Sequence, residues 1–344
     1  TFGPTPYGGT PEPNIEQVSM IASFMHQFNI PLVEAFHIAE NICMHIAPIH
    51  DIGGKVILHQ TVHWANDQVF KCKLLNQLDH VVAPTKYAKD ILCVEGGIAQ
   101  NNITVIPHGV DTVKFHPHKS LLRQELHIKD EQPCILYVGR LDLWKGVHNL
   151  IPLFKKLGED YNVVFIIRGE DFSQEKKLDY LFTTIASKPS SNLIYIREWT
   201  DPAYMEELMA CCDIYVNPSG HEGFCVPLIE AMSCGKPIIS SDLPNHKEIL
   251  SGTLNRLVPC KEKVGVVNDN QDVLVPSADM LYGNIKMLLE NKSEMEILGI
   301  NGRKKAVEEY DLTKIAISWH KLFRSLIPDG YDLNVEQAKR LLVT

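Results

Sequence analysis

Two glutamates stand eight residues apart in IYVNPSGHEGFCVPLIEAMSCGKPIIS, the segment from Ile214 to Ser240. Glu222 precedes a predicted helix, and Glu230 is expected about two turns inside it. The first N–H groups of a helix lack intrahelical partners and the helix dipole is positive there, which favours a phosphate. Carboxylates on either side of that phosphate suit a ligand with a sugar at one end and a ribose at the other. The spacing is equally compatible with no binding role. In that case Glu222 is an acidic residue of the first helical turn and Glu230 is a solvated helix position.

Two cations follow another predicted strand, in YVGRLDLWKGV, Tyr137 to Val147. The strand ends at Gly139, and the loop after it carries Arg140 and Lys145. Such a pair suits a diphosphate, because Arg presents a planar fork of donors and Lys a compact point charge. Cations of this kind are also ordinary in solvated loops, so this segment by itself leaves both interpretations open.

Short runs rich in Val and Ile must position these groups, and amphipathic segments alternate with them. Strands buried on both faces and separated by helices predict a parallel, doubly wound α/β sheet, whose ligands bind at the carboxyl ends of its strands. The predicted strands are Pro31–Val33, Val56–Leu58, Val81–Ala83, Ile103–Asp111, Cys134–Val138, Val163–Ile167, Leu193–Ile196, Ile214–Val216 and Pro237–Ser240.

Composition narrows the class of protein. A chain of 344 residues with 45% apolar and 22% charged residues predicts a globular protein of two domains. A net charge of −9 argues against nucleic-acid binding, which needs clustered Lys and Arg. The nine cysteines are scattered, so we expect free thiols in a reducing cytoplasm, and no apolar run is long enough to cross a bilayer. Because Thr1 rather than Met stands first, we expect natural residues to precede it.

The two segments together closely resemble the retaining GT-B glycosyltransferases of the glycosyl transferases group 1 family, of the E-x7-E type. The resemblance rests on Gly139-Arg140…Lys145-Gly146 and on Glu222-x7-Glu230 within EGFxxPLIEAM. VIPHGVDTVKFHP, Val105 to Pro117, is similar to the interdomain segment of that family, with His108 where Asn is frequent. The resemblance implies two Rossmann-like domains that face each other across a cleft, each with a parallel sheet, and a donor bound mainly to the second.

The resemblance also implies roles for single residues. Arg140 and Lys145 would hold the diphosphate of a nucleoside-diphosphate sugar, and Glu222 would contact the hydroxyls of the transferred sugar. In the first half, His63 would lie near that sugar, with His59 as the second choice. The donor-binding residues that the resemblance implies are Gly9, Gly139, Glu198, Trp199, Phe224, Cys225, Val226 and Glu230, where Glu230 meets the ribose and the backbone of Phe224 to Val226 caps the phosphates.

Some features depart from the family pattern. Cys225 stands where Gly is common, and IIRGED, Ile166 to Asp171, lacks a second glycine. The insert Cys260–Asp272 is long, and we expect it to be a surface excursion. We expect an amino-terminal acceptor-side domain, shortened or incomplete, over 1–115 and a donor domain over 116–312. Carboxyl-terminal helices over 313–344, the first from Thr313 to about Leu326, would cross back to the first domain.

Several possibilities stay open. His59 and His63 have H-x-x-x-H spacing, but no acid lies between them and no Asp-x-Asp occurs, so we expect no metal. The donor is a substrate, so no cofactor is implied; a hexose is the expected sugar. The acceptor is a glycan, a lipid, a protein or a small molecule, and peripheral membrane contact is possible. The alternatives to transfer are a nucleotide-sugar epimerase of GT-B architecture and a non-catalytic sugar-nucleotide-binding protein.

Overall fold

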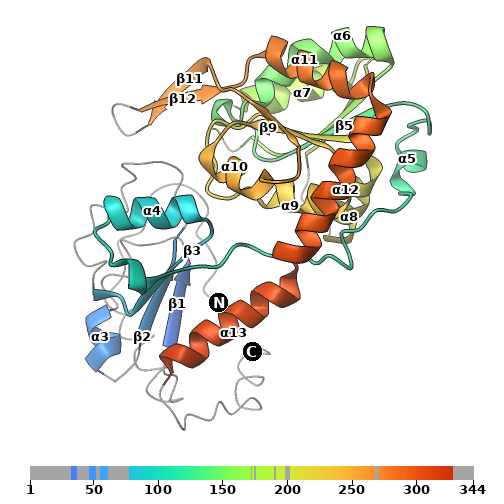
Figure 1. Cartoon of the computed structure of the whole chain (residues 1–344). Helices are drawn as coiled ribbons and strands as arrows, with labels where there is room; N and C mark the ends of the chain where they lie inside the picture. Colours follow the sequence, from blue (N-terminus) through green and yellow to red (C-terminus); the bar gives the residue numbers. More distant parts are fainter. Residues whose placement is uncertain are drawn as a thin grey trace, which may run out of the picture.

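The structure, a computed structural model, describes residues 32–36, 46–51, 55–60, 77–171, 173, 176–189, 191–197, 202–267 and 271–327. Four of the predicted site residues, Gly9, His63, Glu198 and Trp199, lie outside these ranges. The described residues form α/β layers with parallel sheets, as the sequence predicts (Figure 1). The boundaries of the expected domains stay a prediction.

The first half of the chain forms a four-stranded parallel sheet in the order β1-β2-β3-β4. Its strands are rich in Val, Ile and Leu, and β2 and β3 are almost wholly buried. Two short helices, α3 (Ile46–Asp51) and α4 (Lys86–Val94), accompany it. The strands are β1 (Leu32–Phe36), β2 (Lys55–His59), β3 (His80–Ala83) and β4 (Ile103–Val105).

The second half forms a six-stranded parallel sheet in the order β10-β9-β8-β5-β6-β7. Its strands are β5 (Cys134–Val138), β6 (Val164–Arg168), β7 (Leu193–Ile196), β8 (Ile214–Asn217), β9 (Ile238–Ser241) and β10 (Arg256–Val258). Its helices are α5 (Leu122–Glu125), α6 (Ile151–Tyr161), α7 (Lys177–Ala186), α8 (Pro202–Cys211), α9 (Val226–Ser233), α10 (Pro244–Leu250), α11 (Ala278–Leu289) and α12 (Lys292–Glu309).

The central strand β5 shows why the strands read as continuous apolar runs. Cys134, Leu136 and Val138 lie in one buried cluster with residues of α8 and α9. Ile135 and Tyr137 lie in another, with residues of α6 and α11. Side chains alternate between the two faces of a strand, and helices cover both faces, so every position is apolar.

The strand order reverses at β5. From β5 the chain proceeds outward through β6 to β7, then returns to the other side of β5 as β8 and proceeds outward again. In a doubly wound sheet this switch point opens a crevice at the carboxyl ends of the two central strands. The loop after β5 carries Arg140 and Lys145, and the loop after β8 carries Glu222. The topology therefore brings the cations and the acid to one place.

Helix α13 (Leu312–Leu326) connects the second half back to the first (Figure 1). Ile315 and Leu322 pack against Ile57, Val82 and Ile106 of the first half. Backbone hydrogen bonds fix the crossing, because the N–H of Val110 donates to Tyr310 and the N–H of Leu312 donates to Val110. The start and end of this helix match the sequence prediction within one residue.

The insert Cys260–Asp272 is exposed or half-buried wherever the structure describes its side chains, as expected of a surface excursion. It contributes to an antiparallel hairpin of β11 (Glu262–Val267) and β12 (Gln271–Val275). Val273 and Val275 are fully buried. The hairpin also packs on the site loops: a Cβ added at Gly220 would lie 2.4 Å from the carbonyl oxygen of Leu274. The buried side chains of the hairpin lie just after the insert, in β12.

The packing of α13 predicts the effect of truncating its side chains. Leu322 is 8% exposed and contacts the first half, whereas Ile317 on the same helix is 50% exposed. We expect Leu322→Ala to lower the free energy of unfolding by about 2–5 kcal/mol, through lost burial and a cavity. The matched change Ile317→Ala should alter it by less than about 0.5 kcal/mol. Urea unfolding followed by circular dichroism measures both, and equal effects would contradict the packing.

Candidate active site

The loop after β5 is held by local contacts. Tyr137 is buried, and its hydroxyl donates to the carbonyl of Arg140 at 2.7 Å. Burial raises the pKa of Tyr137 well above its ordinary value, so the hydroxyl keeps its proton. A Cβ added at Gly139 would lie 2.7 Å from that hydroxyl oxygen. Any larger residue at position 139 would therefore force the buried ring of Tyr137 to move.

Asp142 organises the two cations. Its side chain caps a short 3₁₀ turn, Leu143–Lys145, by accepting the N–H of Lys145 at 2.9 Å. Its other carboxylate oxygen lies 3.4 Å from Nη2 of Arg140. The Arg140 side chain is 39% exposed, so it can move toward a ligand, whereas Lys145 is far more enclosed.

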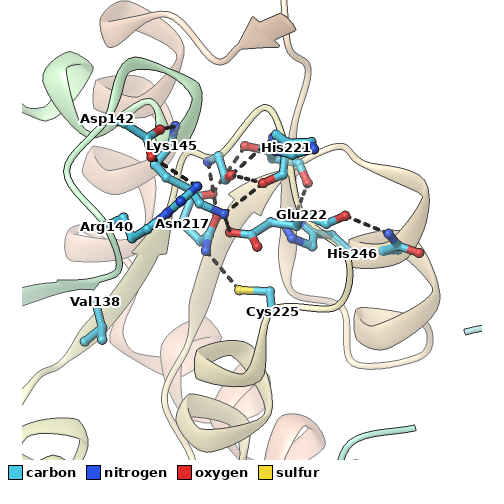
Figure 2. Close-up of polar contacts among 12 residues, drawn as sticks. Val138, Arg140, Asp142, Lys145, Asn217, His221, Glu222, Cys225 and His246 are labelled. Carbon is cyan, nitrogen blue, oxygen red and sulfur yellow. Dashed lines mark hydrogen bonds and ion pairs between the residues drawn. The ribbon is translucent and has the colours of Figure 1, made fainter. Parts of the chain in front are cut away.

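Lys145 and Glu222 form the central contact of the site (Figure 2). Nζ of Lys145 lies 2.9 Å from Oε1 of Glu222 and donates to the carbonyl of His221, also at 2.9 Å. The two side chains are only 13% and 14% exposed. The N–H of Gly220 donates to the carbonyl of Trp144 at 2.7 Å, which joins the backbones of the two loops.

Helix α9 begins later than the sequence suggests. Its first residue is Val226, with Cys225 as the N-cap. Glu222 therefore lies in the loop and not in the first helical turn, and Glu230 lies little more than one turn inside the helix rather than two. Cys225 takes a φ of 81°, which is left-handed and favours glycine, so the common family residue has a conformational reason.

The side chain of Cys225 faces the protein interior. Its sulfur accepts a hydrogen bond from Nδ2 of Asn217 at 3.0 Å (Figure 2). Burial raises the pKa of this thiol well above its ordinary value. The backbone of Cys225 thus forms the start of α9, while its thiol is bonded to Asn217 inside the protein.

Glu230 is half-buried on α9. Burial raises the pKa of its carboxyl from 4.5 to about 7, and the positive charge of Arg168 opposes that shift. Arg168 ends β6, and burial lowers the pKa of its guanidinium. Sequence reasoning missed Arg168, although an Arg at the carboxyl end of an apolar strand was a readable signal. Glu230 is therefore not the solvated helix residue that its spacing also allowed.

Aromatic and imidazole rings bring the first half to the site. His59 ends β2, and its ring centroid lies 5.2 Å from that of His108, which lies 4.9 Å from that of Phe224. Burial lowers the pKa of His108, which favours the neutral imidazole. His108 and Val226 also line a groove of about 580 Å³ against α13. The predicted choice between His63 and His59 stays open, because His63 lies outside the described residues.

Among the residues that the structure describes, no group of three or more His, Cys, Asp or Glu could hold a metal ion. Within the same ranges no helix is both long and apolar enough to span a membrane.

Comparison with known proteins identifies the family. The model of Glycosyl transferases group 1 matches residues 118–305, more than half of the chain. The chain belongs to the Glycosyl transferases group 1 family. The model of Glycosyltransferase Family 4 matches residues 4–114. The site built above lies in the part that the first model covers, apart from the rings of His59 and His108.

Relatives of this family match the chain over part of their length. The alpha-galactosylglucosyldiacylglycerol synthase of Streptococcus pneumoniae is 33% identical over 52% of this chain and 47% of its own. The capsular polysaccharide biosynthesis glycosyltransferase CapM of Staphylococcus aureus is 26% identical over 70% of this chain and 60% of its own. The chain thus spans about half to three fifths of these relatives.

Solved structures show the GT-B fold. The protein HepE of Anabaena, in complex with UDP, superposes with a TM-score of 0.74 at 18% identity, over 90% of this chain and 82% of that one. A glycosyltransferase from Rickettsia africae superposes with a TM-score of 0.75 at 16% identity, over 94% of this chain and 85% of that one. These likenesses confirm the predicted fold class.

The close approach of the two loops predicts the effect of one methyl group. Gly146 has a φ of 64°, and a Cβ there would lie 2.1 Å from the carbonyl oxygen of Pro218. Gly97 has the same φ of 64° with nothing within 4 Å. Alanine at either position should cost about 1–2 kcal/mol of backbone strain. Only Gly146→Ala should also separate the loops.

Thermal unfolding and nucleoside-diphosphate binding distinguish these two effects. We expect both variants to lose the stability that the backbone strain costs. Gly97→Ala should keep its affinity for the ligand, whereas Gly146→Ala should lose affinity as well. Unchanged binding by Gly146→Ala would show that the contact between the loops is not needed for the site.

The raised pKa of Glu230 predicts a pH dependence of stability. Between its ordinary value of 4.5 and about 7, the unfolded carboxyl is ionised while the folded one keeps its proton. Its stabilising contribution is therefore complete below 4.5, is lost as the pH rises through 7, and stays lost above. Relative to the wild type, Glu230→Gln should gain on the order of 2 kcal/mol between pH 5 and pH 8.

Urea unfolding at several pH values measures that difference. The exposed Glu131→Gln is the matched control and should differ from the wild type by the same amount at every pH. A difference for Glu230→Gln that is constant with pH would contradict the burial effect.

Proposed function

We propose that this protein is a retaining glycosyltransferase that moves a hexose from a nucleoside-diphosphate sugar to an acceptor. The observation that carries the proposal is the joined pair of loops at the switch point, where Lys145 meets Glu222 at 2.9 Å beside Arg140 and the start of α9. Family membership supports transfer of a sugar. The complexes of HepE with UDP and with UDP-glucose support a nucleotide-sugar donor, because that protein shares the fold.

The cations would act on the leaving group. When the bond to the sugar breaks, the nucleoside diphosphate departs with growing negative charge. Lys145 is held in place by Glu222 and by the carbonyl of His221, so its ammonium is oriented before the donor arrives. Arg140, on the more exposed side, would close on the diphosphate with its fork of donors. The first N–H groups of α9 would cap the same phosphates.

The two glutamates would bind hydroxyl groups of the donor. Glu222 lies at the ammonium of Lys145, where the sugar of a bound donor would meet it. Glu230 lies further along α9 and would accept hydrogen bonds from the ribose. It can do so on both oxygens only when ionised, and Arg168 favours that form. Binding of the ribose would therefore strengthen as the pH rises through about 7.

Retention of configuration and the absence of a metal requirement are parts of this proposal that rest on the resemblance. In that scheme the acceptor approaches from the side of the departing diphosphate, and a phosphate oxygen takes the acceptor's proton. The cationic cluster replaces a metal as the stabiliser of negative charge. We place the reaction in the cytoplasm, in keeping with free thiols at all seven cysteines that the structure describes.

A donor panel tests the proposal. UDP-, GDP- and ADP-sugars are added one at a time, and the one that binds the folded site should raise the unfolding temperature. At about 100 times its dissociation constant, the ligand should add about 2.7 kcal/mol. With that donor, released nucleoside diphosphate is then measured with water and with a set of glycan and lipid acceptors.

Arg140→Ala and Lys145→Ala should each lower the rate of release by about 10²–10³, as removal of one placed charge stabiliser does. The exposed Lys304→Ala is the control and should match the wild type. A rate within a few-fold of the wild type in Arg140→Ala removes Arg140 from its role. Epimer formation from the donor alone would favour an epimerase. Binding of a donor without any release of nucleoside diphosphate would favour a non-catalytic protein.

A further inference from the structure

The first turn of α4 is completed by the opposite half of the chain. Thr85 is its N-cap and accepts the N–H of Ala88 at 3.0 Å. The N–H groups of Lys86 and Tyr87 donate to the two carboxylate oxygens of Glu248 on α10, at 2.8 and 3.1 Å. Helices have unpaired N–H groups and a positive dipole at this end, so an acid stabilises it. The amino end of α4 and α10 are thereby docked on each other (Figure 1).

A second set of bonds runs from this docked turn to the active site. The hydroxyl of Thr85 donates to Oδ1 of Asn245 at 2.8 Å, and Nδ2 of Asn245 donates to the carbonyl of Glu222 at 2.8 Å. Thr85 and Asn245 are each 1% exposed. One buried amide therefore joins the first half of the chain to the backbone of the residue whose carboxylate pairs with Lys145.

The chemistry of the partners fixes the direction of each bond. The oxygen of Thr85 already accepts the N–H of Ala88, so its hydroxyl hydrogen is available to donate. The carbonyl of Glu222 can only accept, so the NH₂ of Asn245 must face it and the amide oxygen then faces Thr85. The hydroxyl of Thr85, at the docked end of α4, thus holds the far end of the amide that bonds Glu222.

We propose that Asn245 is a positioning residue that holds Glu222 in its working place, and that it does so fully only while α4 is docked on α10. The inference rests on the proposed function in one respect, that Glu222 acts on the donor. Glu222 is then held at two ends: its carboxylate by Lys145 from the loop after β5, and its carbonyl by Asn245 from α10. Donor turnover is coupled in this way to the contact between the halves.

Four variants separate the links. Asn245→Asp is isosteric and still accepts from Thr85, but it replaces the donor to Glu222 with an oxygen. Thr85→Val removes the hydroxyl at the other end, and Thr85→Ser restores it. Glu248→Ala loosens the docking of α4 through Lys86 and Tyr87. The control on the same helix is Lys247→Ala, whose exposed side chain pairs with Asp242.

Hydrogen–deuterium exchange of the full chain reads the coupling without any substrate. We expect Asn245→Asp, Thr85→Val and Glu248→Ala each to speed exchange about five- to tenfold in the 219–225 loop, the effect of about one lost hydrogen bond. Thr85→Ser and Lys247→Ala should exchange as the wild type does. An unchanged 219–225 loop in Asn245→Asp and Glu248→Ala would overturn the proposal.

Turnover separates positioning from a purely structural role. With the donor selected by the panel, Asn245→Asp and Thr85→Val should release nucleoside diphosphate about five- to tenfold more slowly, while their affinity for UDP, GDP or ADP stays within twofold. Equal losses of rate and affinity would mean that Asn245 only supports the fold. A wild type that turns over no donor would refute the proposed function alone, since the exchange result stands by itself.

Discussion

The ion pair between Lys145 and Glu222 is the contact on which the site depends. Its partners come from loops 77 residues apart in sequence, which meet because β5 and β8 are adjacent parallel strands. Two nearly enclosed charges stabilise each other, whereas either alone would be strongly unfavourable. The neighbouring backbones must then approach closely, as the fit of Gly146 against Pro218 and of Gly220 against β12 shows. The tight packing of the loops and the paired charges therefore require each other.

The two glutamates of the site, one before α9 and one within it, lie in different environments. Glu222 faces an ammonium at hydrogen-bond distance, whereas burial raises the pKa of Glu230 to about 7. Burial raises the pKa of Glu230 against the charge of Arg168 at the end of β6, whereas Lys145 after β5 pairs directly with Glu222. A ligand carrying a diphosphate between two sets of hydroxyls would meet these environments in turn.

Two of the contacts between the halves, among the described residues, differ in kind. Helix α13 packs apolar side chains on the first sheet, and α4 offers its amino end to Glu248 on α10. The first contact combines apolar packing with backbone hydrogen bonds at Val110, where α13 begins. The second consists of directional hydrogen bonds, so it reports on the relative position of the halves. Of the two, only the second leads to Glu222, through Asn245.

Sequence alone determined much of the framework. The runs Cys134–Val138 and Leu193–Ile196 were predicted with the bounds that β5 and β7 have, because strands buried on both faces contain continuous apolar residues. The grouping of Arg140, Lys145 and Glu222 was implied by the family resemblance, and the adjacency of β5 and β8 in the structure is what brings their loops together.

Only the tertiary structure decided the finer arrangement. The start of α9 depends on the left-handed turn at Cys225. The packing of the hairpin depends on its contact with the loop at Gly220. Arg168 opposes the rise in the pKa of Glu230, and Thr85 is hydrogen-bonded to Asn245. Both interactions join residues that are far apart in the chain. Local sequence propensity does not predict such contacts, because they form only when the chain has folded and water has been excluded from between the residues.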